Sequence, residues 1–338
     1  MKTDAVQARS VPTLEMVAAL AGVSRATVSR VVNDSPKVKP DVAKAVNEAI
    51  TTLNYVPNRA ARSLASRRTQ SVALVVPEST SKVFADPFFA SVVQGIAMYL
   101  ADTDYTLNMI ISSESKPEKT RRYLLGGNVD GALVVSHHSS DHSWSRLSES
   151  LPIVFAGRPL TGGDSYYVDV DNEAGAEGAT ERLIAGGRRN IATIAGPQDM
   201  PPGIDRLTGW RRALRRAGQG DSLVEIGDFT PASGGAAMRR LLERGVPIDG
   251  LFAANDQMAA GAYSVLNEHG LRIPHDVAVV GFDDDYFGAT VAPALTTVHH
   301  PVVEMGSKMA ELLVGLIAGK PTERVTRLPT SLVIRNSA

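Results

Sequence analysis

The chain has 338 residues, a formal net charge of -1 at pH 7 and no cysteine. Its length indicates two or three domains, and the lack of thiols excludes disulfide scaffolds and thiolate metal sites. The charge is unevenly spread: residues 1–70 hold 11 Lys or Arg against 5 Asp or Glu, so they carry +6 and the remainder carries −7. A basic module on an acidic body suits a polyanionic partner such as DNA.

The N-terminal segment has no signal-peptide pattern. Residues 1–17 contain no apolar core of the required length, and no stretch approaches the roughly 20 apolar residues of a membrane span. We therefore expect a soluble, cytoplasmic protein with no membrane partner.

Residues 13–33 show the pattern of two short helices joined by a tight turn. Gly22 breaks the first helix, and Ser24 is a good N-cap for the second. The residues expected to form the apolar face of the first helix are Val17, Leu20 and Ala21. The residues expected to pack inward from the second are Val28, Val31 and Val32.

The outward face of the second helix predicts contact with DNA. Such a helix fits the major groove, where arginine pairs with guanine and a small residue such as Ala26 permits contact with a thymine methyl. A plain helical hairpin is the alternative interpretation. The residues expected to contact DNA from this segment are Ser24, Arg25, Ala26, Thr27, Ser29, Arg30 and Asn33.

The next two segments favour the DNA-binding interpretation. Residues 40–53 carry an apolar stripe at helical spacing, which would close a three-helix core. In the segment from Tyr55 to Ala65, Asn58 can cap a short helix after Pro57. That helix has too few residues to be stable alone, so we expect it to fold on DNA.

Residues 13–65 closely resemble the DNA-binding head and hinge of the LacI family of bacterial transcription regulators. The resemblance implies that two hinge helices of a homodimer lie in the minor groove, where Leu64 opens the central base step, commonly CpG. A linker with Leu64 packed on the body is the alternative. The hinge residues expected to contact DNA are Asn58, Arg59, Arg62 and Leu64.

The remaining chain alternates short β-branched runs with longer helical patterns, which predicts α/β architecture with parallel sheets. Together with the resemblance this gives an all-α helix-turn-helix head and hinge helix, followed by a two-lobed, periplasmic-binding-protein-like α/β core. The expected domains are residues 1–57 (head), 58–68 (hinge and linker) and 69–338 (effector binding and dimerisation). The chain is expected to cross between lobes near residue 160, and the resemblance implies a return near residue 295.

Ligands of open α/β sheets bind beyond the carboxyl ends of the strands, where several loops here carry polar or aromatic residues. Residues 169–172, 252–256 and 279–284 resemble landmarks of the same family's effector domain. The residues expected to contact a small-molecule effector are Asp86, Phe88, Phe89, Ser136, Arg158, Asp205, Arg206, Phe229, Asn255 and Asp283.

The resemblance implies roles for three of these residues. Asn255 and Asp283 would hydrogen-bond sugar hydroxyls, and Phe229 would stack on an apolar sugar face. The alternatives are a capping or turn carboxylate for Asp283 and core packing for Phe229. Asp171 and Asp256 are interpreted as caps of the helices they precede.

The chain departs from the family pattern at Ile204. Many members have an effector-gripping arginine two residues before the arginine of an Arg-Leu-x-Gly motif, and that motif arginine is Arg206 here. Asp205, Arg206 or Arg158 could replace the missing group. This departure favours a glucoside or oligosaccharide as the effector.

An enzyme is the rival class. The chain contains no dinucleotide-binding glycine fingerprint, phosphate-binding P-loop or Gly-x-Ser-x-Gly elbow. His137, His138 and His142 lack cysteine or an ordered helical pair and fit a solvated loop better than a metal site. Consecutive carboxylates at 283–285 would point to opposite faces of a strand. We therefore predict no catalytic residue, metal or cofactor.

These observations predict a homodimeric, sequence-specific repressor of carbohydrate-use genes. Two symmetric half-sites give useful specificity, so its operator should be near-palindromic. A sugar would switch DNA affinity allosterically, by typically about 1–3 kcal/mol; the sign, induction or co-repression, is open. The alternatives are a purine or phosphate effector on the same fold, or a solute-binding protein, which would have no use for the head.

Overall fold

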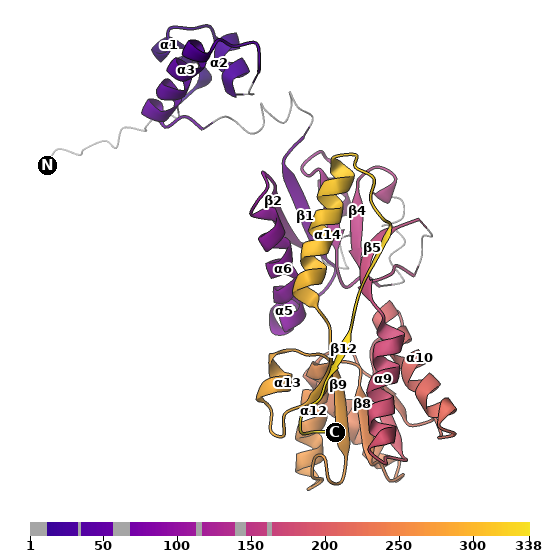
Figure 1. Cartoon of the computed structure of the whole chain (residues 1–338). Coiled ribbons are helices and arrows are strands. Elements are labelled where there is room, and N and C mark those ends of the chain that lie inside the picture. The colour runs from indigo at the N-terminus through magenta and orange to yellow at the C-terminus, as the bar shows by residue number, and fades with distance from the viewer. Residues whose placement is uncertain (1–11, 33–34, 57–67, 113–116, 139–146, 161–163) are drawn as a thin grey trace, which may run out of the picture. The chain divides into compact units, whose positions relative to one another are not determined.

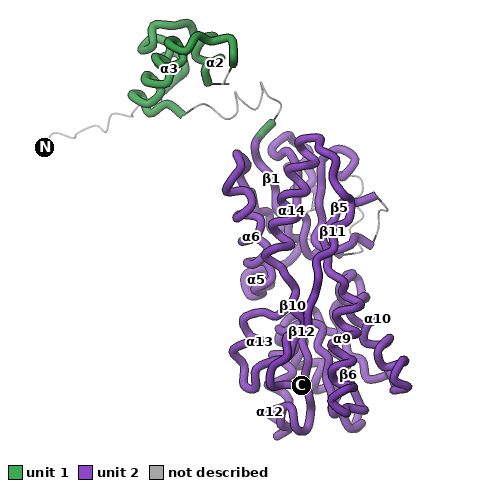
Figure 2. The backbone as a smooth tube through the Cα atoms, viewed as in Figure 1, with its two compact units in different colours: residues 1–69 green, residues 70–338 purple. Residues whose placement is uncertain are grey.

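The computed structural model describes residues 12–32, 35–56, 68–112, 117–138, 147–160 and 164–338. They form two compact units, Met1–Thr69 and Gln70–Ala338, which Figure 2 colours separately. No helix in these ranges is long and apolar enough to span a membrane. The predicted DNA contacts that lie outside the described residues are Asn33, Asn58, Arg59, Arg62 and Leu64.

The first unit is a three-helix bundle, made of α1 (Leu14–Leu20), α2 (Arg25–Val32) and α3 (Pro40–Leu53). Its small core joins residues from all three helices with the segment after α3: Val17, Ala18, Val28, Val31, Val46, Ala49 and Tyr55. Ser24 begins α2 as expected, since its Oγ accepts a hydrogen bond from Thr27 N at 3.1 Å.

The expected position of Leu20 in this core is wrong. Leu20 is 53 % exposed, whereas Ala18 is buried. The inward stripe of α1 follows the i, i+3, i+4, i+7 spacing from Leu14, which passes through Val17, Ala18 and Ala21 and leaves Leu20 on another face.

The second unit consists of two lobes, each built on a six-stranded sheet (Figure 1). The sheet of lobe 1 has the order β11 (Val325–Leu328), β5 (Tyr166–Val170), β4 (Ile153–Ala156), β3 (Gly131–Val134), β1 (Ser71–Val76), β2 (Thr106–Ile111). The sheet of lobe 2 has the order β12 (Ser331–Val333), β10 (Thr296–His299), β9 (Ala278–Asp283), β8 (Gly250–Ala253), β6 (Ile191–Ala195), β7 (Val224–Ile226). Every strand pair is parallel except β10 with β12.

Helices cover both sheets, which explains why central strands such as β1 and β8 read as continuous apolar runs. Lobe 1 carries α5 (Thr80–Ala85), α6 (Pro87–Leu100), α7 (Pro117–Leu125) and α14 (Val302–Ile317). Lobe 2 carries α9 (Asn172–Ala185), α10 (Pro201–Arg216), α11 (Pro231–Glu243), α12 (Asp256–Glu268) and α13 (Tyr286–Thr290). The backbones of α6 and α14 approach closely because each presents a glycine: a Cβ on Gly95 would lie 1.9 Å from Val303 O.

The chain crosses between the lobes three times, after β5, after β10 and between β11 and β12. The first crossing falls later than the expected position near residue 160, because β5 pairs with β4 in the first sheet. The return follows His299, the end of β10. The third crossing, between β11 and β12, was not predicted. Hydrophobic periodicity can identify a strand, but it does not show which sheet the strand joins.

Candidate effector-binding site

A pocket lies between the two lobes, at the carboxyl ends of strands from both sheets. The predicted effector residues that line it are Asp86, Phe88, Phe89, Ser136, Arg206, Phe229, Asn255 and Asp283. The polar lining residues that the prediction did not include are Lys82, His137, Asp169, Asn172 and His300. Asp169, Asn172 and His300 follow the end of a strand or lie at it, so the rule of strand-exit loops would have found them.

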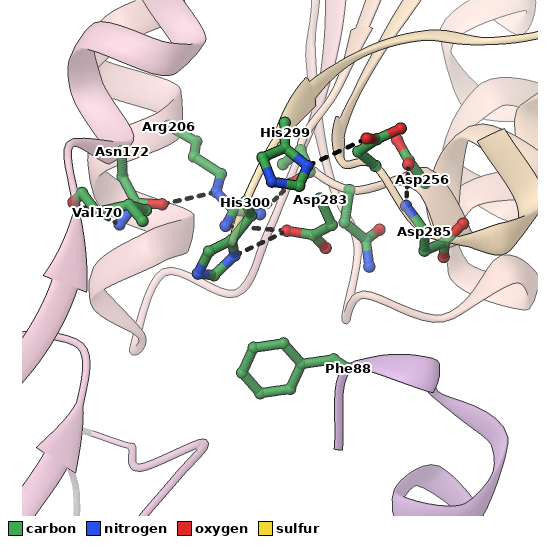
Figure 3. A network of polar contacts seen from close by, with 12 residues as sticks. Phe88, Val170, Asn172, Arg206, Asp256, Asp283, Asp285, His299 and His300 are labelled. Carbon is green, nitrogen blue, oxygen red and sulfur yellow. Dashed lines mark hydrogen bonds and ion pairs between the residues drawn. The ribbon is translucent and has the colours of Figure 1, made fainter. Parts of the chain in front are cut away.

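Arg206, on α10, is the most buried charged group of the pocket, at 4 % exposure. Its Nε donates to Asn172 Oδ1 at 2.9 Å, and its Nη1 donates to the Ala254 carbonyl at 2.5 Å. Its Nη2 lies 3.3 Å from Asp283 Oδ1, and the guanidinium lies 3.6 Å from the centre of the Phe282 ring. Figure 3 shows Arg206 with Asn172 and Asp283. Burial lowers the pKa of Arg206, while the neighbouring carboxylates oppose that effect.

Asp283 ends β9 with a positive φ of 105°, and Asp284 follows at 58°. This conformation is costly for residues other than glycine and is typically found at functional sites. The cap of α13 is Asp285, whose Oδ1 accepts from Phe287 N at 2.8 Å, so Asp283 is free of a capping role. Asp283 Oδ1 instead faces Arg206 and lies 3.4 Å from His300 Nδ1.

Phe229 lies between the core of lobe 2 and the pocket, and its stacking on a sugar stays a prediction. The ring packs against the core of lobe 2 and also lines the pocket. Its backbone has a φ of 71°. A Cβ on Gly196 would lie 2.3 Å from the ring, so a glycine at 196 makes room for the ring. Packing of the Phe229 ring against lobe 2 therefore fixes the orientation of the ring in the pocket.

Asn255 has a structural role beside its position in the pocket. Its Oδ1 accepts from Met258 N at 2.9 Å, which caps α12, and its Nδ2 donates to the Phe229 carbonyl at 3.0 Å. The cap predicted at Asp256 is therefore wrong. Asp256 is fully buried, accepts from Thr297 Oγ1 at 2.6 Å, and has a pKa raised well above its usual value by burial. Asp171 does cap α9, as expected.

Asp86 occupies the lobe 1 side of the pocket and caps α6, since its Oδ1 accepts from Phe88 N at 2.9 Å. The pKa of Asp86 is raised to about 6, chiefly by burial and in addition by Asp283 and Asp285 of lobe 2, against the opposing effects of the Phe88 amide and Lys82. Carboxylates thus face one another across the lobes on this side.

Arg158 and Asp205 are absent from the lining of the pocket, contrary to the prediction. They pair with each other instead: Arg158 Nη2, from lobe 1, lies 3.0 Å from Asp205 Oδ1 on α10 of lobe 2. Successive residues of a helix point about 100° apart, so α10 directs Arg206 inward and Asp205 towards lobe 1. Although Ile204 replaces the arginine of the family pattern, Arg206 still supplies the pocket with a guanidinium.

A second ion pair joins the lobes at His138. Its Nδ1 lies 2.8 Å from Asp199 Oδ2 of lobe 2, and its Nε2 lies 3.5 Å from Glu78 Oε1 of lobe 1. Burial acts to raise the pKa of Glu78, but the neighbouring His138 ring and hydrogen bonds from Lys82 and Ser136 lower it to about 2. Ser136, a predicted effector contact, donates its hydroxyl proton to Glu78 Oε1 at 2.6 Å instead.

In the first unit, the outward face of α2 carries the predicted major-groove residues. Arg25, Ala26 and Arg30 are exposed, while Thr27 and Ser29 are half-buried. Arg25 Nη1 lies 3.2 Å from Glu15 Oε1 of α1, with both side chains largely exposed. An exposed pair of this kind is weak and can open when the arginine meets DNA.

Comparison with known proteins matches both parts of the chain. Residues 13–58 match the model of bacterial regulatory proteins of the lacI family, and residues 180–338 match a periplasmic binding protein-like domain. The HTH-type transcriptional regulator CelR of Thermobifida fusca is 48 % identical, over 98 % of this chain and all of that protein. The regulator GalR of Escherichia coli K12 is 34 % identical, over 96 % of this chain and 94 % of that protein.

Comparison with solved structures finds regulators of the same kind. A CelR–cellobiose complex is 46 % identical and covers 97 % of this chain and 100 % of that chain, with a TM-score of 0.77. The lac repressor dimer bound to operator and the anti-inducer ONPF is 28 % identical and covers 96 % of this chain and 98 % of that chain, with a TM-score of 0.85.

Proposed function

Because this chain belongs to the lacI family of bacterial regulatory proteins, we propose that it is a homodimeric, operator-binding repressor of carbohydrate-use genes, controlled by a glucose disaccharide in the pocket between its lobes. Cellobiose is the effector we favour, since it is the ligand named in the structure of CelR, a relative of nearly equal length. Residues 1–57 would bind the major groove, residues 58–68 the minor groove, and residues 69–338 the effector and the second subunit.

The arrangement of Arg206, Asp283 and Asn255 beside Phe229 is the observation that supports a sugar most directly. Vicinal hydroxyls both donate and accept, so they suit a guanidinium, a carboxylate and an amide held in fixed positions. The aromatic rings of Phe88 and Phe229 offer apolar surface to the C–H face of a pyranose.

The charges of the pocket argue against a purine nucleotide or phosphate effector. Lys82 is already paired with Glu78 at 2.7 Å, and Arg206 faces Asp283. Asp86 and Asp169 add further acidic groups to the lining. Both cations of the pocket are thus already matched by carboxylates, which suits a neutral polyhydroxy ligand better than an anion.

The ligand assignment is tested by isothermal titration of the full chain with cellobiose, galactose, ribose and inorganic phosphate. We expect cellobiose to bind, Asp283→Asn to weaken binding at least tenfold, and Asp221→Asn to have no effect, because Asp221 pairs with the exposed Arg215 outside the pocket. Binding of phosphate with no response to any sugar would reject the carbohydrate assignment.

The DNA assignment is tested by anisotropy, with near-palindromic duplexes that the chain selects from a random pool. We expect Arg30→Ala to cost about 1–3 kcal/mol on the selected duplex and to relax base preference. Equal affinity for all duplexes, lost at moderate salt, would indicate nonspecific association instead. Addition of cellobiose then reports whether the sugar releases DNA or strengthens its binding.

A further inference from the structure

An ion pair joins the first two helices of the head. Glu15 lies in the first turn of α1, and Arg25 is the first residue of α2; Glu15 Oε1 lies 3.2 Å from Arg25 Nη1. The two helices lie side by side (Figure 1), with Val17 of α1 and Val28 of α2 in the same small core. The packing of the helices therefore keeps the carboxylate within reach of the guanidinium.

The carboxylate of Glu15 carries a full negative charge at neutral pH. The pKa of Glu15 is lowered chiefly by its own backbone amide, then by the Thr13 side chain and by Arg25, against the opposing effect of burial. Thr13 caps α1, since its Oγ1 accepts from Met16 N at 3.4 Å. The charge is thus held at the start of α1, beside the N-terminal end of α2, which is the end that contacts base edges in a helix-turn-helix.

Arg25 keeps donors for DNA while it is paired. A guanidinium has five N–H donors in a rigid fork, and the O6 and N7 atoms of guanine accept two of them. Glu15 lies against Nη1, and within the described residues Nε and Nη2 of Arg25 have no partner. A guanine edge, which is neutral, can therefore bind Arg25 beside Glu15. A phosphate in the same position would be repelled by the carboxylate.

We propose that Glu15 is a specificity-determining residue of the DNA interface, which directs Arg25 towards a guanine and away from the phosphates. The carboxylate orients the guanidinium from the neighbouring helix and offsets its charge. Attraction to the DNA backbone falls, while the directed bonds to the guanine edge remain. The proposal rests on the proposed function, in that α2 must lie in the major groove.

The test measures base selectivity, because an exposed ion pair contributes little to folding. Each base pair of the half-site is replaced in turn in the duplex that the full chain selects, and affinities are measured by anisotropy. Arg25→Ala should lower discrimination at one base pair about tenfold, which identifies the pair that Arg25 reads. Glu15→Gln should lower discrimination at that same pair by about two- to fivefold, the worth of an exposed ion pair. Discrimination at the pair read by Arg30 should not change.

Nonspecific binding gives a second measurement. On a scrambled duplex, Glu15→Gln should bind more tightly than the native chain at low salt. Its plot of log affinity against log salt should steepen by about one per subunit, because Arg25 then contacts a phosphate. Glu48→Gln, at an exposed carboxylate of α3, removes the same charge and is the matched control; it should leave base discrimination unchanged. Thermal melting checks that each variant is folded.

Three results would overturn the proposal. Discrimination at the Arg25 pair that is unchanged in Glu15→Gln, or lowered equally in Glu48→Gln, would remove the role of Glu15 and leave the DNA assignment intact. An Arg25→Ala variant that discriminates at every base pair as well as the native chain would do the same. A native chain that prefers no duplex over a scrambled one would reject both the proposal and the proposed function.

Discussion

At the scale of single residues, the pocket depends on a buried cation whose partners are all fixed. Arg206 bonds Asn172, the Ala254 carbonyl and Asp283, and stacks on Phe282. A guanidinium in such a fork is preorganised, so a ligand meets it without paying for its ordering. The same network joins the start of α9, the end of β8 and the end of β9.

Arg206→Lys should therefore damage both stability and effector binding. A lysine cannot supply the three directed bonds, so the buried Asn172 and the partly buried Asp283 lose partners at a cost of about 3–5 kcal/mol. Urea unfolding measures that loss, and isothermal titration should find cellobiose binding lost. Arg215→Lys, at an exposed arginine of the same helix whose ion-pair partner is Asp221, should be nearly neutral. Equal losses of stability and of cellobiose affinity in the two variants would contradict the role proposed for Arg206.

Gly196→Ala tests the position of Phe229 without removing its ring. The new methyl would lie 2.3 Å from the ring carbons, so the ring must move. We expect cellobiose affinity to fall about tenfold, as one aromatic contact is lost. Gly178→Ala is the control, since a Cβ there meets nothing within 4 Å. A Gly196→Ala variant with native affinity would show that Phe229 does not contact the sugar.

At the scale of elements, the two lobes attract each other on one side of the pocket and repel on another. The start of α10 carries the attractive side, where Asp205 pairs with Arg158 and the preceding Asp199 pairs with His138. On the side of α6 and α13, Asp86 faces the carboxylates of lobe 2. Closure of the lobes is therefore expected to depend on pH.

The direction follows from the pKa shifts. The carboxylate of Glu78, with that of Asp199 in addition, raises the pKa of His138 above its usual 6.5, against the opposing effect of burial. The His138 contribution is thus complete below about pH 6.5 and is lost as pH rises through the raised value. The pKa of Asp86, raised to about 6, acts in the same direction between about pH 4 and 6. X-ray scattering from pH 5.5 to 8.5 should report lobes that open as pH rises.

His138→Gln isolates the histidine contribution to this response. The glutamine keeps a hydrogen-bonding group but does not titrate, so the slope above pH 6.5 should disappear while Lys82, which also faces Glu78, is unchanged. A scattering profile of the native chain that is constant with pH would refute the pH-dependent closure of the lobes.

At the scale of the whole molecule, the head and the body are separate compact units. The effector pocket is built entirely from the second unit, and the predicted major-groove residues belong to the first. Coupling between effector and DNA must therefore pass from one unit to the other, and the segment that joins the units in sequence is the covalent link between them. Residues 58–68, expected to bind the minor groove, occupy that position in sequence.

Leu64→Ala tests that connection. Loss of the minor-groove wedge should lower affinity for the selected operator by at least tenfold in anisotropy. Titration with cellobiose should be unchanged, because the pocket lies in the other unit. Ser63→Ala serves as the neighbouring control. Operator affinity equal to that of the native chain would favour a plain linker with Leu64 packed on the body.

Some features were readable because local patterns determine them. The three helices of the head, the alternation of strands and helices, and the polar loops after the strands all follow from spacing along the chain. The parallel arrangement then places those loops at one edge of each sheet. This is why most predicted effector residues lie in one pocket.

Contacts between residues that are distant in sequence were decided only by the tertiary structure. Strand β5 belongs to the first sheet because it pairs with β4. The buried carboxylate of Asp256 accepts a hydrogen bond from Thr297 instead of capping α12. Arg158 pairs with Asp205 outside the pocket lining, whereas His300, which the prediction did not include, lines the pocket. The amino-acid sequence by itself determined the family, the fold class and the kinds of groups at the site. Which of those groups meet depends on long-range packing, because a side chain's charge is local but its nearest partner is set by the fold.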